Sequence, residues 1–326
     1  MDKSAESFYH YPLSSIKEEG TPMSYAEYGV KEGGKKLSIV VPLFNEENNV
    51  QPVVEDLEET LSTLGISYEI ILVDDGSTDD TGDVARALAR EYGAVKAFSH
   101  ETNKGKSAAM MTGFRYVEGD YVVLMDGDGQ FLAQDIPNMI EKLEEGYDVV
   151  NGWGKKKEPI TKIIPSLIYN GISRKLFSLS VHQFNLGYKA FKREAVKDIF
   201  LKKDEHRYIL PLLKEKGCTI AEVPVEYLPR QTGKSKYGVM RIPTGILDMV
   251  ALKLELMFGE RPFRPLGMAS LALIFLGVIP GIHALQGWIS GSMSMWSMVL
   301  SVIFFLSGIN MLLIGYAVEA VKYSHR

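Results

Sequence analysis

The run Val122-Val-Leu-Met-Asp126-Gly-Asp128-Gly-Gln130 is the most informative part of this 326-residue chain. Its apolar start is typical of a buried strand, and that strand ends abruptly in carboxylates. Mg²⁺ and Mn²⁺ prefer oxygen ligands, and two carboxylates two positions apart on a turn can share one ion. One interpretation is a metal, held by Asp126 and Asp128, that clamps a diphosphate. The alternative is a solvated Asp/Gly turn.

Two other apolar runs end in polar turns in the same way. Leu37 to Leu43 leads into Phe44-Asn-Glu-Glu47, and Glu69 to Val73 leads into Asp74-Asp-Gly-Ser-Thr-Asp-Asp-Thr81. Helical patterns follow, and Asn103-Lys-Gly-Lys-Ser-Ala-Ala109 opens another helix. Repeated strand–turn–helix units predict a doubly wound α/β sheet. The polar loops should gather at one edge, where such sheets bind ligands.

The composition bounds the class of protein. With 46% hydrophobic and 24% charged residues, the chain can bury a full core and has room for a second module. A formal net charge of −5 supplies no basic field, so nucleic acid is not an expected partner. The single cysteine excludes an intrachain disulfide framework.

Two long apolar runs dominate the C-terminal part. Leu266 to Leu285 and Met295 to Val318 contain no Asp, Glu, Lys or Arg, and each is long enough to cross a bilayer. Buried core helices are the alternative. The short uncharged connection, Gly287 to Ser294, predicts a hairpin. Within it, Asn310 is expected to hydrogen-bond between the helices.

The charges that flank the hairpin predict its orientation. Arg261 and Arg264 precede the first span, and Lys322 and Arg326 follow the second. The positive-inside rule puts both flanks on the cytoplasmic face. The chain is therefore expected to be an integral protein of the cell membrane, or of an ER-type membrane, with a cytoplasmic globular part.

The hairpin also suggests how the whole chain is divided. Apolar residues within Ile242 to Phe258 fall near one helical face, which favours a helix lying on the membrane surface over an ordinary core-facing helix. The division predicted is a poorly ordered extension at residues 1–36, a globular domain at 37–238, an interfacial helix and linker at 239–264, and a hairpin with a short tail at 265–326.

Taken together, the loops resemble those of a family 2 glycosyltransferase of the GT-A fold. The matching pieces, in order, are Val41-Pro-Leu-Phe-Asn-Glu46, Val73-Asp-Asp-Gly-Ser77, Asn103-Lys-Gly105 and Asp126-Gly-Asp-Gly-Gln130. Arg230-Gln-Thr-Gly-Lys-Ser-Lys236 is by itself a mobile anion-binding loop or a solvated charged loop. It is similar to a segment found in the polyprenyl-phosphate members of the family, some of which have a two-span C-terminal hairpin.

This resemblance implies an activity and a set of site residues. The activity is transfer of one sugar from a UDP- or GDP-linked nucleotide sugar to a dolichyl or undecaprenyl phosphate at the lipid bilayer, with Mg²⁺ or Mn²⁺ and inversion. A homo-oligomer is left open. The implied metal ligands are Asp126, Asp128 and Gln130, and the implied catalytic residues are these three with Arg230 and Lys236. The implied nucleotide-sugar contacts are Pro42, Phe44, Glu46, Val73, Asp75, Lys104, Gly127, Arg207 and Ser235.

Two positions depart from the pattern of these relatives. An arginine that would hold the lipid phosphate is replaced by Gly154, followed by Lys155, Lys156 and Lys157 as weaker candidates for that role. An aspartate is replaced by Gln183. Since a phosphate monoester is largely ionised at neutral pH, its transferase does not need the general base that a hydroxyl acceptor requires.

Two other functions are compatible with parts of this pattern. A processive polysaccharide synthase would carry a Q-x-x-R-W motif, which this sequence lacks, and further spans. A non-catalytic nucleotide-sugar or lipid-binding membrane protein is suggested by Gly154 and Gln183. The intact residues Asp126, Asp128 and Gln130 argue against it.

Overall fold

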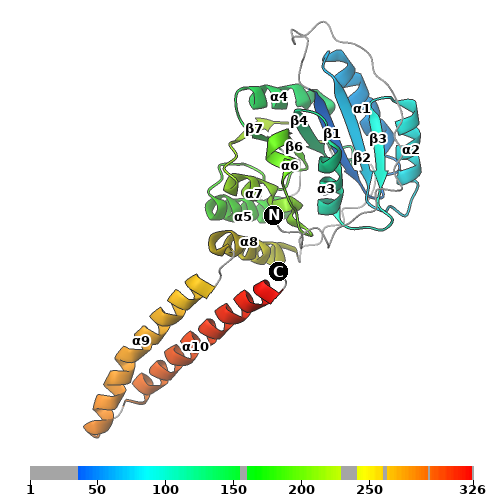
Figure 1. Cartoon of the computed structure of the whole chain (residues 1–326). Coiled ribbons are helices and arrows are strands. Elements are labelled where there is room, and N and C mark those ends of the chain that lie inside the picture. The colour runs from blue at the N-terminus through cyan, green and yellow to red at the C-terminus, as the bar shows by residue number, and fades with distance from the viewer. Residues whose placement is uncertain (1–35, 155–159, 229–240, 260–262, 293, 325–326) are drawn as a thin grey trace. The chain divides into compact units, whose positions relative to one another are not determined.

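The computed structural model describes residues 36–154, 160–228, 241–259, 263–292 and 294–324 (Figure 1). By internal contacts the chain forms a globular unit that ends at Ile246 and a helical unit that begins at Leu247. Of the predicted N-terminal extension, only Lys36 falls within the described residues.

A seven-stranded mixed sheet is the centre of the globular unit, in the order β3-β2-β1-β4-β6-β5-β7. Strand β6 runs antiparallel to its neighbours β4 and β5, while the other pairs are parallel. The predicted doubly wound α/β sheet is therefore confirmed. The strands are β1 (Leu37–Leu43), β2 (Tyr68–Asp74), β3 (Val95–Ser99), β4 (Tyr121–Met125), β5 (Val149–Trp153), β6 (Tyr188–Lys192) and β7 (Ile220–Pro224).

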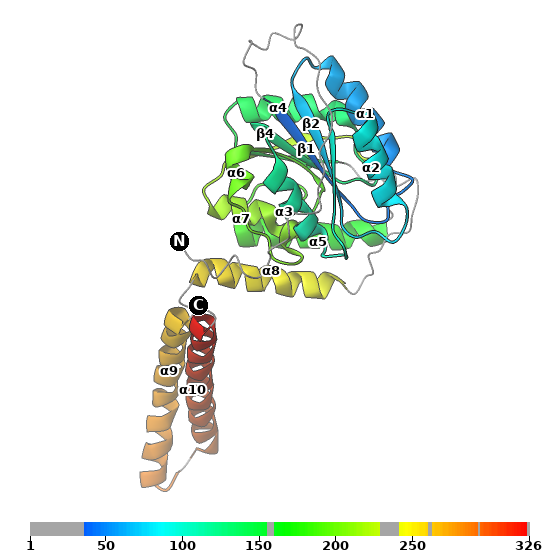
Figure 2. The ribbon, with the colours of Figure 1, turned by 45° about the vertical axis from the view of Figure 1, so that its right-hand side comes forward.

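Helices cover both faces of this sheet (Figure 2). Alternate β1 residues such as Ile39 and Val41 pack into a core with α1, α2 and α4, while Val40 faces α3. This alternation follows from the strand's two-residue period. A Cβ at Gly113 would lie 2.2 Å from a Val40 methyl, so glycine there lets α3 pack closely against the sheet. The helices are α1 (Val50–Thr63), α2 (Thr81–Glu91), α3 (Lys106–Tyr116), α4 (Ile136–Glu144), α5 (Ile160–Phe177), α6 (Arg193–Lys197) and α7 (Ile209–Glu215), with short 3-10 turns η3 (Ala133–Asp135) and η4 (Glu205–Tyr208).

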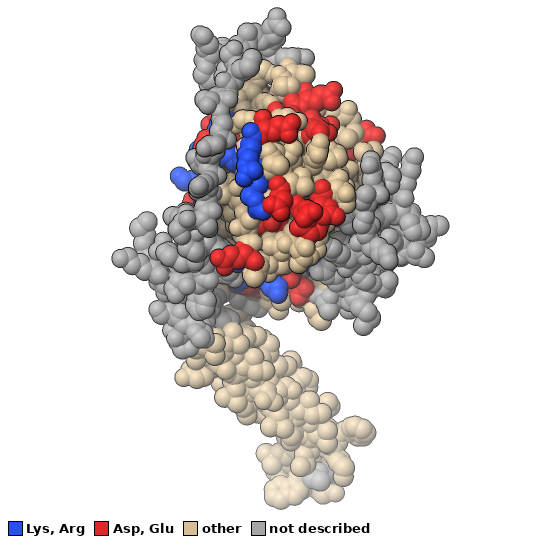
Figure 3. Space-filling view, turned by 90° about the vertical axis from the view of Figure 1, so that its right-hand side faces the viewer, with Lys and Arg blue, Asp and Glu red and all other residues tan. Residues whose placement is uncertain are grey.

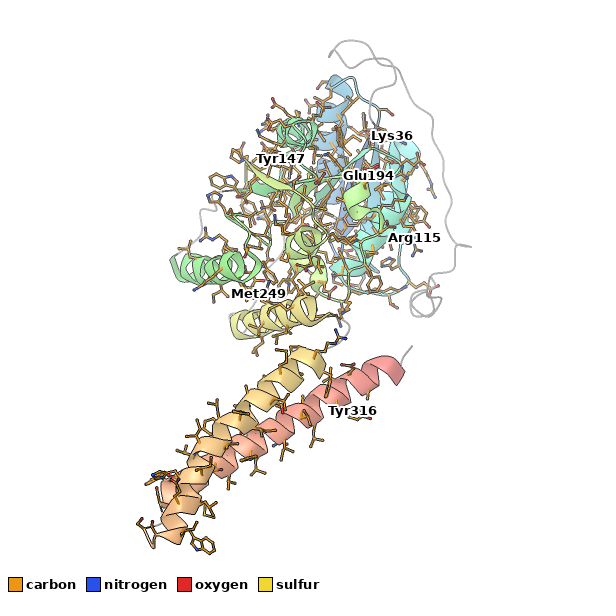
Figure 4. The ribbon with its side chains drawn as sticks, turned by 60° about the vertical axis from the view of Figure 1, so that its left-hand side comes forward. Lys36, Arg115, Tyr147, Glu194, Met249 and Tyr316 are labelled. Carbon is orange, nitrogen blue, oxygen red and sulfur yellow. The ribbon has the colours of Figure 1, made fainter. Side chains whose placement is uncertain are left out.

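An ionic network joins the amino ends of the central strands. The buried Glu69 carboxylate accepts hydrogen bonds from the Ser38 hydroxyl (2.6 Å) and the Glu118 N–H (2.8 Å). The Glu118 carboxylate pairs with Lys36 (labelled in Figure 4) at 2.5 Å and with Lys96 at 2.9 Å. These hydrogen bonds lower the pKa of Glu118 to about 2. The network ties β1, β2 and β3 together at the edge opposite the polar loops.

The helical unit contains α9 (Phe263–Ile289) and α10 (Met295–Ser324), both long and apolar enough to cross a membrane. Tyr316 projects outward from α10 (Figure 4), and the hairpin surface in Figure 3 is almost entirely uncharged. Small residues lie between the helices: a Cβ at Gly308 would meet Ile274 at 2.6 Å. Small residues at these positions let the backbones of the two helices approach closely.

Several hydrogen bonds join the two helices, among them the Phe263 N–H to Glu319 (2.9 Å), His283 Nδ1 with the Ser297 hydroxyl (2.9 Å) and two from serines to backbone carbonyls. The Ser270 hydroxyl donates to the Gly308 carbonyl (2.7 Å), and the Ser301 hydroxyl donates to the Gly277 carbonyl (2.9 Å). Asn310, which is exposed, takes no part in these bonds, so the prediction for it is wrong. A serine at a small-residue interface lies close enough to the opposite backbone to reach a carbonyl, whereas position 310 lies on the outer face.

Helix α8 (Arg241–Phe258) continues from the globular unit into the helical one. Met249 (labelled in Figure 4) and Leu252 are buried, whereas Leu247, Leu254 and Met257 are exposed. The helix therefore carries a buried and an exposed apolar side. The membrane-surface role of this segment stays a prediction.

Candidate active site

The candidate site lies where the strand order reverses. Strand β1 sits between β2 and β4, and all three are parallel, so Leu43, Asp74 and Met125 end at the same edge of the sheet. Open α/β sheets bind ligands in the crevice beyond such a reversal. The loops that begin after these three strands are the polar loops expected from the sequence.

Asp75 organises one of these loops. Its buried carboxylate accepts hydrogen bonds from the N–H groups of Lys104 (2.9 Å) and Gly105 (2.7 Å) and contacts His100 Nδ1 at 2.7 Å. Gly105 has a φ of +92°, which glycine adopts without a steric penalty, and α3 begins at the next residue, Lys106. Asp75 therefore determines where α3 starts.

Asp126 is held between α3 and β6. Its N–H donates to the Gly187 carbonyl (3.0 Å), and its Oδ1 accepts from Lys106 Nζ at 2.5 Å. A Cβ at Gly187 would lie 2.0–2.2 Å from the three atoms of the Asp126 carboxylate. Only glycine at position 187 leaves the carboxylate room to face the loop edge.

The rest of the acidic motif turns within the same loop. Gly127 packs tightly, since a Cβ there would lie 2.3 Å from Leu43, and the N–H of Gln130 donates to Asp128 Oδ1 (3.3 Å). Gln130 Nε2 donates to the Leu228 carbonyl (3.1 Å), so the amide nitrogen is used in this bond and the amide oxygen is left to act as a ligand. Two carboxylates and an amide oxygen form a donor set that suits Mg²⁺ or Mn²⁺.

Among the described residues, this donor set is the candidate binding site for a metal ion. In the described part of the chain, no group of three or more His, Cys, Asp or Glu side chains gathers around a common point. An ion would therefore depend on the amide of Gln130 together with Asp126 and Asp128. Lys106 already places one positive charge against Asp126.

Other implied nucleotide contacts lie around the same edge, and their local roles differ. The Glu46 N–H donates to Thr81 Oγ1 (2.8 Å), while the Glu46 carboxylate accepts from Asn49 (2.6 Å). Pro42 and Phe44 are partly exposed beside the end of β1. Val73 is fully buried, so its side chain belongs to the core, and only its backbone is near the loop.

Arg207 belongs to η4, which packs at the start of α3. The N–H of the preceding residue, His206, donates to the Ser107 hydroxyl (3.0 Å), and its Nδ1 lies 3.1 Å from the same oxygen. The Arg207 guanidinium pairs with Asp204 at 3.6 Å. Arg230, Ser235, Lys236 and Lys155, Lys156 and Lys157 lie outside the described residues.

A polar row crosses the sheet beside β4, and two of its three residues, Lys189 and Asn151, are buried. Lys189 on β6, Asn151 on β5 and Glu222 on β7 are direct neighbours in register. Asn151 Nδ2 donates to Glu222 (2.8 Å), and Lys189 Nζ donates to the Leu186 carbonyl. Burial lowers the pKa of Lys189 to about 7, with repulsion from Lys106 acting in the same direction.

The two positions that depart from the family pattern contact each other. Gln183 Nε2 donates to the Gly154 carbonyl (2.7 Å), and the Gly154 N–H donates to Gln183 Oε1 (3.3 Å). An aspartate at position 183 would lack the donor for the first of these bonds. A Cβ at Gly154 would lie 2.9 Å from Tyr227 Cβ. The two departures are thus structurally complementary.

Sequence reasoning missed three residues at this site. Lys106 could have been identified from the sequence, because it directly follows Asn-Lys-Gly and is the first residue of the predicted helix. Lys189 was signalled by a lysine inside the otherwise apolar run Tyr188-Lys-Ala-Phe191. Gly187 had no local signal, because its role depends on the antiparallel insertion of β6 beside β4.

Comparison with known proteins agrees with this architecture. Residues 38–200, half of the chain, match the model of glycosyl transferase family 2. Mannosyl-3-phosphoglycerate synthase from Rubrobacter xylanophilus shares the fold, with a TM-score of 0.56 and 19% identity over 68% of this chain and 74% of that one. Glucosyl-3-phosphoglycerate synthase from Mycobacterium tuberculosis, solved with Mn²⁺ and UDP-glucose, has a TM-score of 0.54 and 20% identity over 69% and 79%.

Curated relatives extend the likeness beyond the globular unit. Dodecaprenyl-phosphate galacturonate synthase from Rhizobium johnstonii is 31% identical over 301 residues, covering 89% of this chain and 88% of the relative. Undecaprenyl-phosphate 4-deoxy-4-formamido-L-arabinose transferase from Klebsiella pneumoniae is 30% identical over 251 residues, 76% of this chain and 75% of the relative. By its matched domain, its fold and these relatives, the chain belongs to glycosyltransferase family 2 and is a glycosyltransferase.

Proposed function

We propose that this glycosyltransferase moves one sugar from a UDP- or GDP-linked nucleotide sugar to a polyprenyl phosphate at a membrane surface. The observation that carries the proposal is the pairing, in one chain, of the acidic motif at the sheet reversal with a hairpin able to cross a membrane. Relatives named for transfer to dodecaprenyl and undecaprenyl phosphate support the lipid acceptor.

On the donor side, Asp126, Asp128 and Gln130 would hold a divalent ion. When bound, that ion neutralises the charge that develops on the departing nucleoside diphosphate. Lys106 supplies a second cation beside Asp126, 2.5 Å away, and Gly187 prevents the carboxylate from being displaced. Arg230, Lys236 and Ser235 are proposed to reach the diphosphate from the following loop, as in similar family members.

On the acceptor side, the chemistry requires positioning more than proton removal. A phosphate monoester has a second pKa of about 6 and is mostly ionised at neutral pH. Its oxygen can therefore attack the anomeric carbon directly, opposite the leaving diphosphate, which inverts that carbon. Gln183, a neutral amide bonded to Gly154, suits a reaction in which no side chain must act as base.

The membrane arrangement is part of the same proposal. The hairpin at 265–326 would span the bilayer, and the segment at 239–264 would lie at its surface. The basic residues Arg264 and Lys322 flank the apolar runs on the same side. The catalytic domain at 37–238 would then face the cytoplasm.

A direct assay tests the proposal. Full-length protein in detergent is incubated with radiolabelled UDP- and GDP-sugars, a short polyprenyl phosphate and Mg²⁺ or Mn²⁺, and lipid extracts are counted. We expect one sugar per lipid with inverted anomeric configuration. A water-soluble polymer would instead indicate a processive synthase, and binding without turnover would indicate a non-catalytic protein.

A further inference from the structure

His182 is held in one orientation beside the candidate active site. Its Nδ1 lies 2.8 Å from Glu222 Oε2, and its ring stacks on Trp153 with centroids 4.6 Å apart and planes 22° from parallel. The His182 N–H also donates to both Glu222 oxygens. With Nδ1 engaged, Nε2 is the nitrogen that can meet a ligand, and 62% of the side chain is exposed.

The loop that carries His182 is anchored on both sides. The carbonyl of the next residue, Gln183, accepts a hydrogen bond from Asn151 Nδ2 (2.8 Å). The Gln183 side chain forms two hydrogen bonds with the backbone of Gly154. Five residues later, Gly187 contacts Asp126. The chain between His182 and Gly187 spans at most ~18 Å when fully extended. Trp153, on which the imidazole stacks, ends β5 at the same edge of the sheet at which β4 ends before Asp126, so His182 lies at the edge that carries the acidic motif.

His182 lines a hollow of about 690 Å³, and the other polar side chains among the described residues that line it are cationic or neutral. Arg174 and Lys175 line it from the last turn of α5, and Ser178 and Ser180 add hydroxyl groups. No carboxylate is among the described residues that line it. Within the described part of the chain, neither Arg174 nor Lys175 forms an ion pair. Two cations and two hydroxyls around an oriented imidazole are complementary to a phosphate.

We propose that His182 is an acceptor ligand: with both ring nitrogens protonated when the lipid binds, Nδ1 donates to Glu222 and Nε2 donates to the phosphate monoester, while stacking on Trp153 fixes the ring. This inference rests on the proposed function and specifies how the lipid phosphate is held. Arg174 and Lys175 add charge around that phosphate. Gly154 itself has no side chain for this role, and its backbone is bonded to Gln183. Glu222 is a positioning residue, because it acts on the phosphate only through the imidazole.

Two substitutions of His182 separate ligand contact from structural support. The Asn side chain can place its amide nitrogen near the position of Nδ1, and the Gln side chain can place it near Nε2. His182→Asn should keep the bond to Glu222 but lose the phosphate donor, and His182→Gln should do the reverse. If His182 binds phosphate, Asn is the more harmful replacement. If the ring only anchors the loop, the order is reversed.

The experiment measures binding and turnover on full-length protein in neutral detergent. Binding of a short polyprenyl phosphate is compared with binding of the matching polyprenol by titration calorimetry. We expect His182→Asn to weaken phosphate binding about 10-fold to 100-fold, the range for a lost charge-assisted hydrogen bond. Polyprenol binding and the KM for the nucleotide sugar should stay unchanged. Lys197→Ala, which removes an exposed helix lysine outside the hollow, is the matched control.

Each outcome decides the inference. Wild-type affinity in His182→Asn, equal losses for phosphate and alcohol, or the reversed Asn/Gln order would overturn it. So would a loss that appears only with anionic phospholipid vesicles, which would indicate a general membrane contact. Absence of sugar transfer by the wild type, with phosphate binding still dependent on His182, would refute the proposed function and leave this binding site standing.

Discussion

Gly187→Ala should disable the candidate active site without unfolding the protein. The added Cβ would lie 2.0 Å from the nearest Asp126 oxygen, whereas ordinary contacts begin at 3.4 Å, so the carboxylate must move by about 1.4 Å. Misplacing a catalytic group by about 1 Å can cost roughly 100-fold in rate. That factor corresponds to ~2.7 kcal/mol in the activation barrier. The Gly187 carbonyl that accepts from Asp126 remains, so the pairing of β4 with β6 should survive.

The assay measures initial rates of sugar transfer at saturating lipid across a series of metal concentrations. We expect kcat to fall about 100-fold and the metal requirement to rise, with an unchanged circular dichroism spectrum. Gly267→Ala is the matched control, because its nearest neighbour, Phe263, would be 3.9 Å from the new Cβ. Wild-type turnover and metal dependence in Gly187→Ala would refute the assignment of Asp126 to the reaction centre.

Asp128→Asn should raise the barrier by about 2.7–4 kcal/mol, a loss of a few hundred-fold in kcat, and chelator should abolish wild-type activity; metal titrations of both proteins check this. In a variant without the native cysteine, a cysteine at Ser290 should be labelled from outside intact cells and one at Ser324 should not, and the reverse pattern would contradict the orientation. The pKa of Glu118 is lowered to about 2 from 4.5, so its carboxylate stabilises the fold above pH 4.5 and that contribution is lost as the pH falls toward 2. Glu118→Gln should therefore flatten the pH dependence of chemical unfolding in that window, and an unchanged slope would contradict the network. Gly154→Arg should lower the free energy of unfolding by about 1–3 kcal/mol, because the new side chain would overpack the space beside Tyr227, and it should not improve the KM for the lipid. Tighter lipid binding by a variant of wild-type stability would contradict this packing.

Much of the site was predictable because its signals are local. The apolar run before Asp126 predicts a buried strand, and the sequence Asp126-Gly-Asp128 predicts the turn that follows it. Neither prediction depends on residues far away in the chain. The buried core of β1 and the lengths of α9 and α10 are readable for the same reason. Each pattern arises from the period of a single element or from a single run of apolar residues.

The contacts made by β6 were not predictable in this way. Its antiparallel insertion between β4 and β5 brings Gly187 against Asp126 and aligns Lys189 with Asn151. Strand order is set by packing between segments far apart in the chain, and a two-residue period is the same in either direction. The bond between Gln183 and Gly154 likewise depends on this insertion.

The family, the acidic motif, the strand-and-helix alternation and the two apolar helices can be read from the sequence, because each depends on residues that are close together in the chain. The cation that contacts Asp126, the need for glycine at position 187 and the orientation of His182 are visible only in the folded protein. Those features require side chains from different strands and helices to meet within a few ångströms. Such meetings depend on register and packing, which no local pattern contains.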